Sequence, residues 1–260
     1  MQEDTILTTR DGAVMTLTLN RPAAFNSFTR PMASALQAGL DEAANDTSIR
    51  CVVLTGTGKA FCAGQDLKEV TASDAPPLED FVHGTYNTTV RKMRALQKPL
   101  ISAVNGVAAG AGANLALAAD LCVATESAKF IQAFSKIGLI PDSGGTWMLP
   151  KLIGLQRATA LAFLGTPVMA SDAVTMGMIH RAVPDEDFHT EVTALAQKLA
   201  GMPTHGLALT KAAFNAAFEQ GLDAHLDTEM KHQAEASRTD DYAEGVAAFL
   251  EKRKPAFQGH

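Results

Sequence analysis

The sequence of 260 residues predicts an α/β fold that ends in a helical region. Short apolar runs such as "CVVLT" at 51–55 are typical of buried strands. The segments between these runs carry apolar residues at helical spacing, and strands that alternate with helices indicate α/β architecture. From about residue 155 onward the pattern is almost entirely helical, which predicts a helical layer in the last third of the chain.

The first elements follow from local signals. Residues 5–9 and 14–19 are rich in strand-forming residues and flank Asp11-Gly12, so they predict a β-hairpin. Thr29 is a suitable helix cap, and the apolar residues after it recur at helical spacing to about residue 45. The buried strand at 51–55 comes next and ends at a glycine.

The middle of the chain alternates between loops, helices and strands. Residues 71–77, "TASDAPP", predict a mobile loop, and a helix over 78–96 should follow and end before Pro99. Strands are predicted at 100–104 and 121–124, with a Gly/Ala-rich turn and a helix between them. Further helices are predicted at the end of the chain, over 189–200, 207–219 and 243–250.

Composition excludes several classes of function. The net charge of −6 argues against a broad electrostatic grip on nucleic acid. Three cysteines without C-x-x-C spacing indicate neither a disulfide framework nor a metal site. The N-terminus has no apolar signal core, and the longest apolar run, 100–124, contains Asn, Asp and Gly, so no membrane span is expected. We expect a cytoplasmic, reducing location.

Two glycine-rich turns are candidates for main-chain chemistry. In "AFCAGQDL", residues 60–67, Gly64 permits a backbone angle that could aim the N–H of Gln65 into a cavity. In residues 105–117, "NGVAAGAGANLAL", a helix should begin near 110–111 and present free N–H groups. Two such groups that converge would make an oxyanion hole. The alternative is that both are tight turns packed together, and neither matches the Rossmann or P-loop spacing.

The stretch "GLIPDSGGT", residues 138–146, places one carboxylate, Asp142, before two glycines. Local pattern favours an N-cap for a helix over 144–152. The alternative is a general base in an apolar pocket. The two differ in chemistry, because a cap position lowers the pKa of a carboxyl and an apolar pocket raises it.

Taken in order, these motifs resemble the crotonase (enoyl-CoA hydratase/isomerase) superfamily over the whole chain. "LNRPAAFNSF" at 19–28 and "VAAFLEKRKPAF" at 246–257 are similar to its CoA-contacting loop and C-terminal helix. The resemblance implies a ClpP/crotonase-like spiral of ββα units over 1–200, with the acyl-CoA site, and a helical trimerisation region over 201–260. It also implies a homotrimer or dimer of trimers, and an enolate held by the N–H groups of Gln65 and Ala111.

The sequence departs from the family pattern where hydratases carry two glutamates. These positions are Asn114 and Phe134, which cannot shuttle a proton as a carboxylate does. The resemblance therefore points to the isomerase branch, with Asp142 as the single proton shuttle. The motifs are most similar to isomerases that act on ring-bearing acyl-CoA thioesters of phenylacetate degradation. Apolar Ala133, Phe134 and Trp147 near the base would suit a ring.

The resemblance also implies residues that contact the acyl-CoA thioester. Coenzyme A is part of the substrate, and no separate cofactor is expected. Lys68 and Lys252 would lie near CoA, with the solvated surface charge as the alternative for each. The full set predicted to bind substrate or CoA is Ala24, Phe25, Ala63, Gln65, Asp66, Leu67, Lys68, Ala109, Asn114, Phe134, Pro141, Phe249 and Lys252.

Three alternatives to the isomerase remain open. One is an enzyme of fatty-acid oxidation type, either an enoyl-CoA hydratase or a Δ3-Δ2-enoyl-CoA isomerase. In the second, the aryl-CoA dehalogenase branch, an Asp at position 142 would be a nucleophile, but that branch keeps a Trp where this chain has Phe134. The third is a protein that binds acyl-CoA without turnover.

Overall fold

The structure is a computed structural model that describes residues 4–260, and it confirms the α/β prediction. An antiparallel hairpin opens the chain, as predicted. Three pairs of strands follow, and in each pair the first strand joins a large sheet and the second a small one. The strands are β1 (Ile6–Asp11), β2 (Val14–Leu19), β3 (Cys51–Gly56), β4 (Ala60–Cys62), β5 (Leu100–Val104), β6 (Val107–Ala109), β7 (Leu121–Thr125), β8 (Lys129–Ile131), β9 (Val168–Met169) and β10 (Arg181–Val183).

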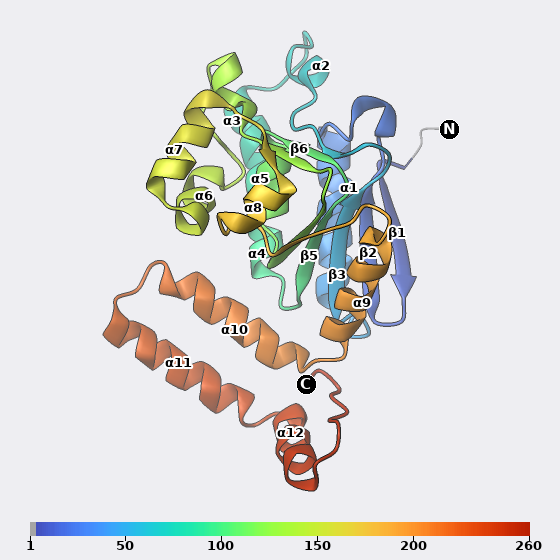
Figure 1. Ribbon diagram of the computed structural model, residues 1–260, viewed down its shortest axis with the longest axis vertical. Helices are drawn as coiled ribbons and strands as arrows, with labels where there is room; N and C mark the ends of the chain where they lie inside the picture. Colours follow the sequence, from blue (N-terminus) through green and yellow to red (C-terminus); the bar gives the residue numbers. More distant parts are fainter. Residues whose placement is uncertain (1–3) are drawn as a thin grey trace.

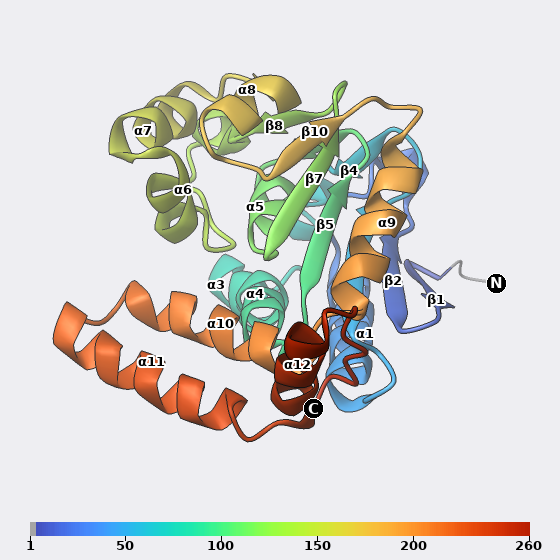
Figure 2. The same cartoon turned by 60° about the horizontal axis from the view of Figure 1, so that its bottom comes forward.

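The two sheets give the molecule its spiral. The large sheet has six strands in the order β1-β2-β3-β5-β7-β10, parallel from β2 onward. The small sheet has four strands in the order β4-β6-β8-β9, of which the first three are parallel. Each turn of the chain therefore adds one strand to each sheet, and Figures 1 and 2 show the helices wound around them.

Helices cover the sheets and then form the end of the chain. Thr29 caps α1 with its hydroxyl, as predicted, by accepting a hydrogen bond from Met32 N at 3.4 Å. The helices are α1 (Arg30–Asn45), α2 (Leu67–Val70), α3 (Leu78–Val82), α4 (Thr88–Ala95), α5 (Ala111–Leu117), α6 (Gly145–Ile153), α7 (Leu155–Leu164), α8 (Ala170–Thr175), α9 (Phe188–Ala200), α10 (Thr204–Ala217), α11 (Leu222–Ala236) and α12 (Asp240–Glu251). Three short helical turns complete the set, η1 (Pro22–Ala24), η2 (His83–Asn87) and η3 (Ala133–Ile137).

One prediction about an element needs correction, and the almost entirely helical region contains two short strands that were not predicted. The helix predicted over 78–96 is interrupted by η2, a π turn in which Thr88 N–H donates to the carbonyl of His83, five residues back. The region after residue 155 is not entirely helical, because β9 and β10 each pair with a sheet. These strands have two and three residues, too few to show a strand period in the sequence.

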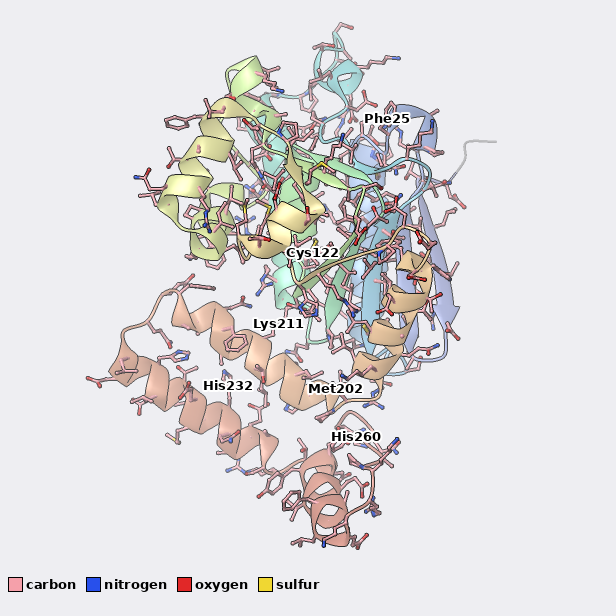
Figure 3. All side chains as sticks on the ribbon, in the orientation of Figure 1. Phe25, Cys122, Met202, Lys211, His232 and His260 are labelled. Atoms are coloured by element: carbon pink, nitrogen blue, oxygen red, sulfur yellow. The ribbon has the colours of Figure 1, made fainter. Side chains whose placement is uncertain are left out.

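The last helices attach to the core through buried polar contacts. Lys211 on α10 donates to Asp120 Oδ2 and to the carbonyl of Met93, both at 2.9 Å, and Figure 3 labels it on α10. Arg50 donates to the carbonyl of Phe257 at 2.8 Å and so holds the C-terminal tail. Helix α12 lies at the opposite end of the molecule from α2 (Figure 1). Within residues 4–260, no helix is both long and apolar enough to cross a membrane.

Candidate active site

The segment around Asp142 decides between the two roles left open for its carboxylate. Helix α6 begins at Gly145, and its N-cap is Gly144, which has a left-handed backbone (φ 78°) and gives no side-chain cap. Ser143 is also left-handed, with φ 52°. Asp142 lies outside the cap position, so the N-cap interpretation is wrong. Its main-chain carbonyl, not its carboxylate, serves the helix, by accepting from Gly145 N–H at 2.8 Å.

The carboxylate of Asp142 is partly buried and poorly compensated. Its one side-chain partner in the described chain is the hydroxyl of Ser143, which donates to Oδ1 at 2.9 Å. Burial raises the pKa of Asp142 to about 6, and the hydrogen bond from Ser143 only partly opposes that rise. No cation pairs with this carboxylate among residues 4–260. A carboxyl of this kind can accept and return a proton near neutral pH.

The turn after β4 aims the N–H of Gln65 away from the main chain of Phe28. Gly64 has φ 91°, a conformation that favours glycine, and its carbonyl accepts from Phe28 N–H at 2.7 Å. A trans peptide is planar, so the N–H of Gln65 points opposite to that carbonyl. It has no backbone acceptor within the part of the chain that is described.

The start of α5 aims a second N–H in the same way. Gly110 adopts φ 53°, and its carbonyl accepts from Ala113 N–H at 3.1 Å and Asn114 N–H at 3.3 Å. The N–H of Ala111, in the same peptide as that carbonyl, is therefore directed out of the helix start. The two turns touch: a Cβ on Gly64 would lie 3.5 Å from Ala111 N. The two predicted donors are thus neighbours, as an oxyanion hole requires.

Asn114 connects this helix to the Asp142 segment. It lies one turn after Ala111 and is fully buried. Its Nδ2 donates to the carbonyl of Asp142 at 2.9 Å, and its Oδ1 accepts from Gln132 Nε2 at 2.8 Å. With no exposed atom, Asn114 does not have the substrate contact predicted for it in this conformation. It holds the main chain of Asp142 instead.

The apolar residues predicted near the base separate into two groups. Phe134 on η3 is buried, and its Cζ lies 3.9 Å from where a Cβ on Gly110 would be, so it borders the helix start. Trp147 was predicted beside the base, but it packs edge-to-face on Phe218 with ring centroids 5.1 Å apart. Lys151 Nζ lies 3.3 Å from the centroid of the Trp147 ring. Trp147 therefore faces the end of α10 and is removed from the predicted ring pocket.

The predicted CoA contacts fall in two places. The loop at 22–28 lies beside β4, because Ala63 N–H donates to the carbonyl of Phe25 at 3.0 Å, and Phe25 is exposed (Figure 3). Leu67 and Lys68 are exposed at the start of α2. The other predicted contacts lie in the loop at 22–28, after β4, at the end of β6 and next to Asp142; they are Ala24, Ala63, Ala109 and Pro141. Phe249 and Lys252 lie on α12 and its C-cap, at the far end of the same chain (Figure 1).

Asp66 has a structural task that the sequence did not reveal. Its Oδ2 accepts from Arg21 at 2.7 Å, and its Oδ1 caps α2 by accepting from Lys68 N–H at 3.1 Å. Burial opposes ionisation, but these hydrogen bonds and the charge of Arg21 lower the pKa of Asp66 overall. The carboxylate is thus occupied within the protein. A direct role of Asp66 in binding CoA stays a prediction.

Two further residues of the site were missed by sequence reasoning. Tyr86 in η2 donates its hydroxyl to Gln65 Oε1 at 2.7 Å, and Gln132 supports Asn114 through the bond to its Oδ1. Each is far in sequence from its partner, and a lone Tyr or Gln gives no local signal. Only the fold brings them together.

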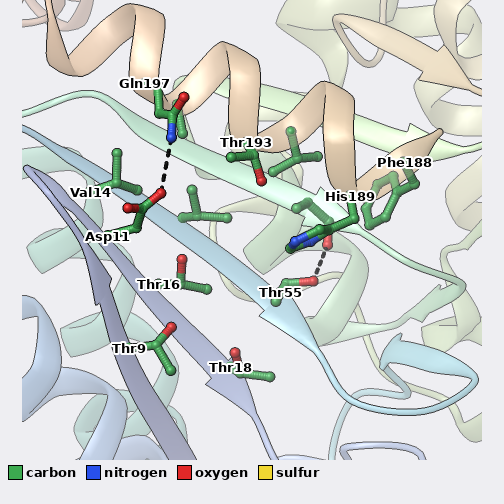
Figure 4. A pocket seen from close by; sticks show the side chains of 14 residues that line it. Thr9, Asp11, Val14, Thr16, Thr18, Thr55, Phe188, His189, Thr193 and Gln197 are labelled. Carbon is green, nitrogen blue, oxygen red and sulfur yellow. Dashed lines mark hydrogen bonds between the residues drawn. The ribbon is translucent and has the colours of Figure 1, made fainter.

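A hollow lies on the other side of β3 from these turns. It measures about 360 Å³ and lies between β1–β3 and α9, where Figure 4 shows Thr9, Thr16, Thr18 and Thr55 directed into it. Its carboxylate, Asp11, accepts from Gln197 at 3.0 Å. It offers no pair of free main-chain N–H groups beside a buried acid. In residues 4–260, no group of three or more His, Cys, Asp or Glu side chains is placed to hold a metal ion.

Comparison with known proteins gives a consistent picture. Residues 9–260 match the enoyl-CoA hydratase/isomerase family. The chain is 49% identical to the 1,2-epoxyphenylacetyl-CoA isomerase of Escherichia coli strain K12, over 98% of each chain. It is 44% identical to a probable enoyl-CoA hydratase of Rhodobacter capsulatus, over 94% of this chain and 93% of the relative.

The structure agrees with these sequence relationships. It is similar to the crystal structure of the enoyl-CoA hydratase of Bacillus anthracis, with a TM-score of 0.94 at 33% identity, over 98% of this chain and 100% of that one. This likeness confirms the crotonase fold expected from the motifs. The chain belongs to the enoyl-CoA hydratase/isomerase family.

Proposed function

We propose that the chain is an isomerase that acts on acyl-CoA thioesters through an enolate. One observation carries this proposal: Asn114 ties the Asp142 segment to the helix that starts at Ala111, and of positions 114, 134 and 142 only Asp142 carries a group that can move a proton. Asp142 has a pKa raised to about 6, while Asn114 is a fully buried amide and Phe134 is apolar. One carboxylate is sufficient to move a proton between two carbons, whereas the family's hydration chemistry uses two.

The proposed mechanism has two proton transfers. Asp142 as carboxylate removes a proton from a carbon made acidic by the thioester, and electrons move onto the thioester oxygen. The N–H groups of Gln65 and Ala111 hold that oxygen. Asp142, now protonated, returns the proton to another carbon of the same acyl chain, so the atoms of substrate and product are the same. Loss of one such donor in other enzymes costs about 3–4 kcal/mol.

We further propose that the substrate is 1,2-epoxyphenylacetyl-CoA. The support is the 49% identity to the isomerase of that name, together with Phe134 beside the start of α5 as an apolar wall for a ring. Coenzyme A arrives as part of the substrate, and no separate cofactor takes part. The exposed loop at 22–28 and the start of α2 are the CoA-binding surface in this proposal.

The proposed assembly is a homotrimer or a dimer of trimers, built through residues 201–260. Phe249 and Lys252 are exposed on the end of the chain that lies opposite α2. A neighbouring copy could bring them to the CoA of another subunit, which would reconcile their predicted role with their position.

Mass spectrometry of the product tests the proposed function. Incubation with 1,2-epoxyphenylacetyl-CoA, and separately with a 3-enoyl-CoA, should yield products of unchanged mass that elute differently from the substrates. In heavy water, the same reaction should place deuterium on carbon. Unchanged substrate with no deuterium uptake would refute the proposal and leave a hydratase or an acyl-CoA-binding protein.

Hydration of an enoyl-CoA is the second candidate, because a probable hydratase is 44% identical to the chain. A hydratase would give a product heavier by one water from a 2-enoyl-CoA. A high rate of that reaction, unaffected by Asp142→Asn, would favour it over the isomerase.

A further inference from the structure

Tyr86 is a buried residue that the proposed chemistry does not itself use. It is 1% exposed, and it is one of two tyrosines in the chain. Its hydroxyl donates to Gln65 Oε1 at 2.7 Å. The ring stacks on Phe28, with centroids 5.3 Å apart and planes at 23°, and a tilted contact to Phe81 at 6.0 Å fixes its other side.

The side chain of Gln65 spans the turn that carries the proposed oxyanion donor. Its Nε2 donates to the carbonyls of Phe28 and Asp66, both at 3.3 Å. The main chain of Phe28 already bonds both sides of this turn, through Gly64 O at 2.7 Å and Asp66 N at 3.1 Å. The side-chain amide of Gln65 is thus held at Nε2 by two main-chain carbonyls and at Oε1 by the hydroxyl of Tyr86.

The π turn places Tyr86 where it can make this bond. An extra residue in a helical turn rotates the residues after it about the helix axis, and π turns are often found at functional sites. Helix α1 contacts this turn: Gln37 Nε2 donates to the carbonyls of Gly84 at 3.0 Å and Thr85 at 3.2 Å, and Thr85 O also accepts from Thr89 Oγ1 at 2.7 Å. A second helix therefore supports the irregular turn, which keeps the hydroxyl directed at Gln65.

We propose that Tyr86 is a positioning residue for the N–H of Gln65. Its hydroxyl fixes the Gln65 side chain and thereby the direction of the N–H that holds the enolate oxygen. This inference rests on the proposed function, and it adds a residue that does not touch the reacting atoms. Without the hydroxyl, Gln65 Oε1 would lose its donor, and the side chain of Gln65 would keep only its bonds to the carbonyls of Phe28 and Asp66.

Steady-state kinetics of the isomerisation test this role, with Tyr86→Phe as the variant and Tyr242→Phe as the matched control. The hydroxyl of Tyr242 on α12 makes no hydrogen bond within residues 4–260, and Phe keeps the ring for any contact of α12 in the proposed assembly, so Tyr242→Phe should leave kcat unchanged. Tyr86→Phe keeps the ring and should lower kcat about tenfold with KM nearly unchanged, part of the roughly 10²–10³-fold cost of losing a donor. The fall of kcat/KM at acid pH that protonation of Asp142 should cause is expected at the same pH in this variant as in the wild type.

A double-mutant cycle separates positioning from a general packing effect. Gln65→Met keeps the main-chain N–H and the side-chain shape but removes the hydrogen bonds. If Tyr86 acts through Gln65, Tyr86→Phe should cause no further loss of kcat in the Gln65→Met background. Wild-type kcat in Tyr86→Phe, or losses that multiply in the double variant, would overturn the inference.

Amide hydrogen exchange tests the same inference without substrate. Asp66 N–H is bonded to Phe28 in this turn and should exchange faster in Tyr86→Phe than in the wild type, while Tyr242→Phe should match the wild type. Unchanged exchange would count against the inference even if the protein proved to have no isomerase activity. A wild type that fails to isomerise would instead refute the proposed function, so the two failures are distinguishable.

Discussion

Replacing Asp142 by Asn should abolish turnover and at the same time stabilise the folded protein. Burial raises the pKa of Asp142 from its ordinary 3.8 to about 6, which means that the folded protein disfavours the charged form. Each unit of pKa corresponds to about 1.4 kcal/mol, so the ionised side chain costs roughly 3 kcal/mol of folding free energy. Water reaches part of this carboxyl, and we therefore expect a gain of about 2 kcal/mol in Asp142→Asn.

The sign of this effect depends on pH. Because the folded pKa is raised, the protonated carboxyl favours folding at low pH, and that contribution is lost as the pH rises through about 6. Asp142→Asn should therefore be more stable than the wild type at pH 8. The two proteins should have nearly equal free energies of unfolding near pH 4, where the folded wild type is neutral at this position.

Urea unfolding at pH 8 and near pH 4, at one fixed protein concentration, measures the difference. Asp187→Asn is the matched control, since Asp187 is exposed before α9 and does not cap it with its side chain. We expect it to change the free energy of unfolding by no more than about 0.5 kcal/mol. Equal stability of Asp142→Asn and wild type at pH 8, or the same stabilisation at both pH values, would refute the assignment of a buried, raised-pKa carboxyl.

The same contacts support three further predictions. In the wild type, kcat/KM for isomerisation should fall below about pH 6 as Asp142 becomes protonated. Asn114→Asp should move this fall to higher pH, because it replaces an amide that donates to the main-chain carbonyl of Asp142 at 2.9 Å by a negative charge. A pH–rate profile that did not move would contradict this prediction. Gly64→Ala should lower kcat about 10²-fold or more, because the new Cβ would lie 2.8 Å from the carbonyl oxygen of Ala109 and the alanine would have to keep a φ of 91°. Single-turnover kinetics would show this loss, and a normal rate would exclude the proposed donor geometry. Lys211→Met should cost about 1–2 kcal/mol in urea unfolding, because it removes the bonds of Lys211 to Asp120 and to the carbonyl of Met93 while Asp120 keeps Arg94 and Leu100 N–H; little change would mean that these bonds do not hold α10 to the core.

Local signals predicted the regular elements well where they were strong. The hairpin at 6–19, the capped helix from Thr29 and the buried strands were predicted because their periods and caps are contained in contiguous residues. The π turn at 83–87 and the short strands β9 and β10 were missed, since a single added residue or a two-residue strand leaves no period to detect.

The candidate site was harder to predict than the regular elements, because its contacts join residues that are far apart in the sequence. The motif "DSGGT" suits a cap, but two successive left-handed residues, Ser143 and Gly144, shift the cap past Asp142. The roles of Asn114 and Tyr86 depend on partners 28 and 21 residues away, so no local pattern could reveal them. Main-chain donors were predicted from glycine placement, because the need for an unusual backbone angle is visible in the residue type.

The order of the small sheet has a consequence for how this chemistry can change. β4, β6 and β8 are parallel neighbours, and each leads into one contribution: the N–H of Gln65, the N–H of Ala111, and the segment that ends at Asp142. The first two are main-chain atoms that only a replacement by proline deletes, whereas the third is one side chain on one loop. The proposed oxygen-holding N–H groups and the proposed proton carrier can therefore vary independently: a side chain that carries a proton can be gained or lost after β8 or on α5, as at Asn114, while the two main-chain donors stay as they are.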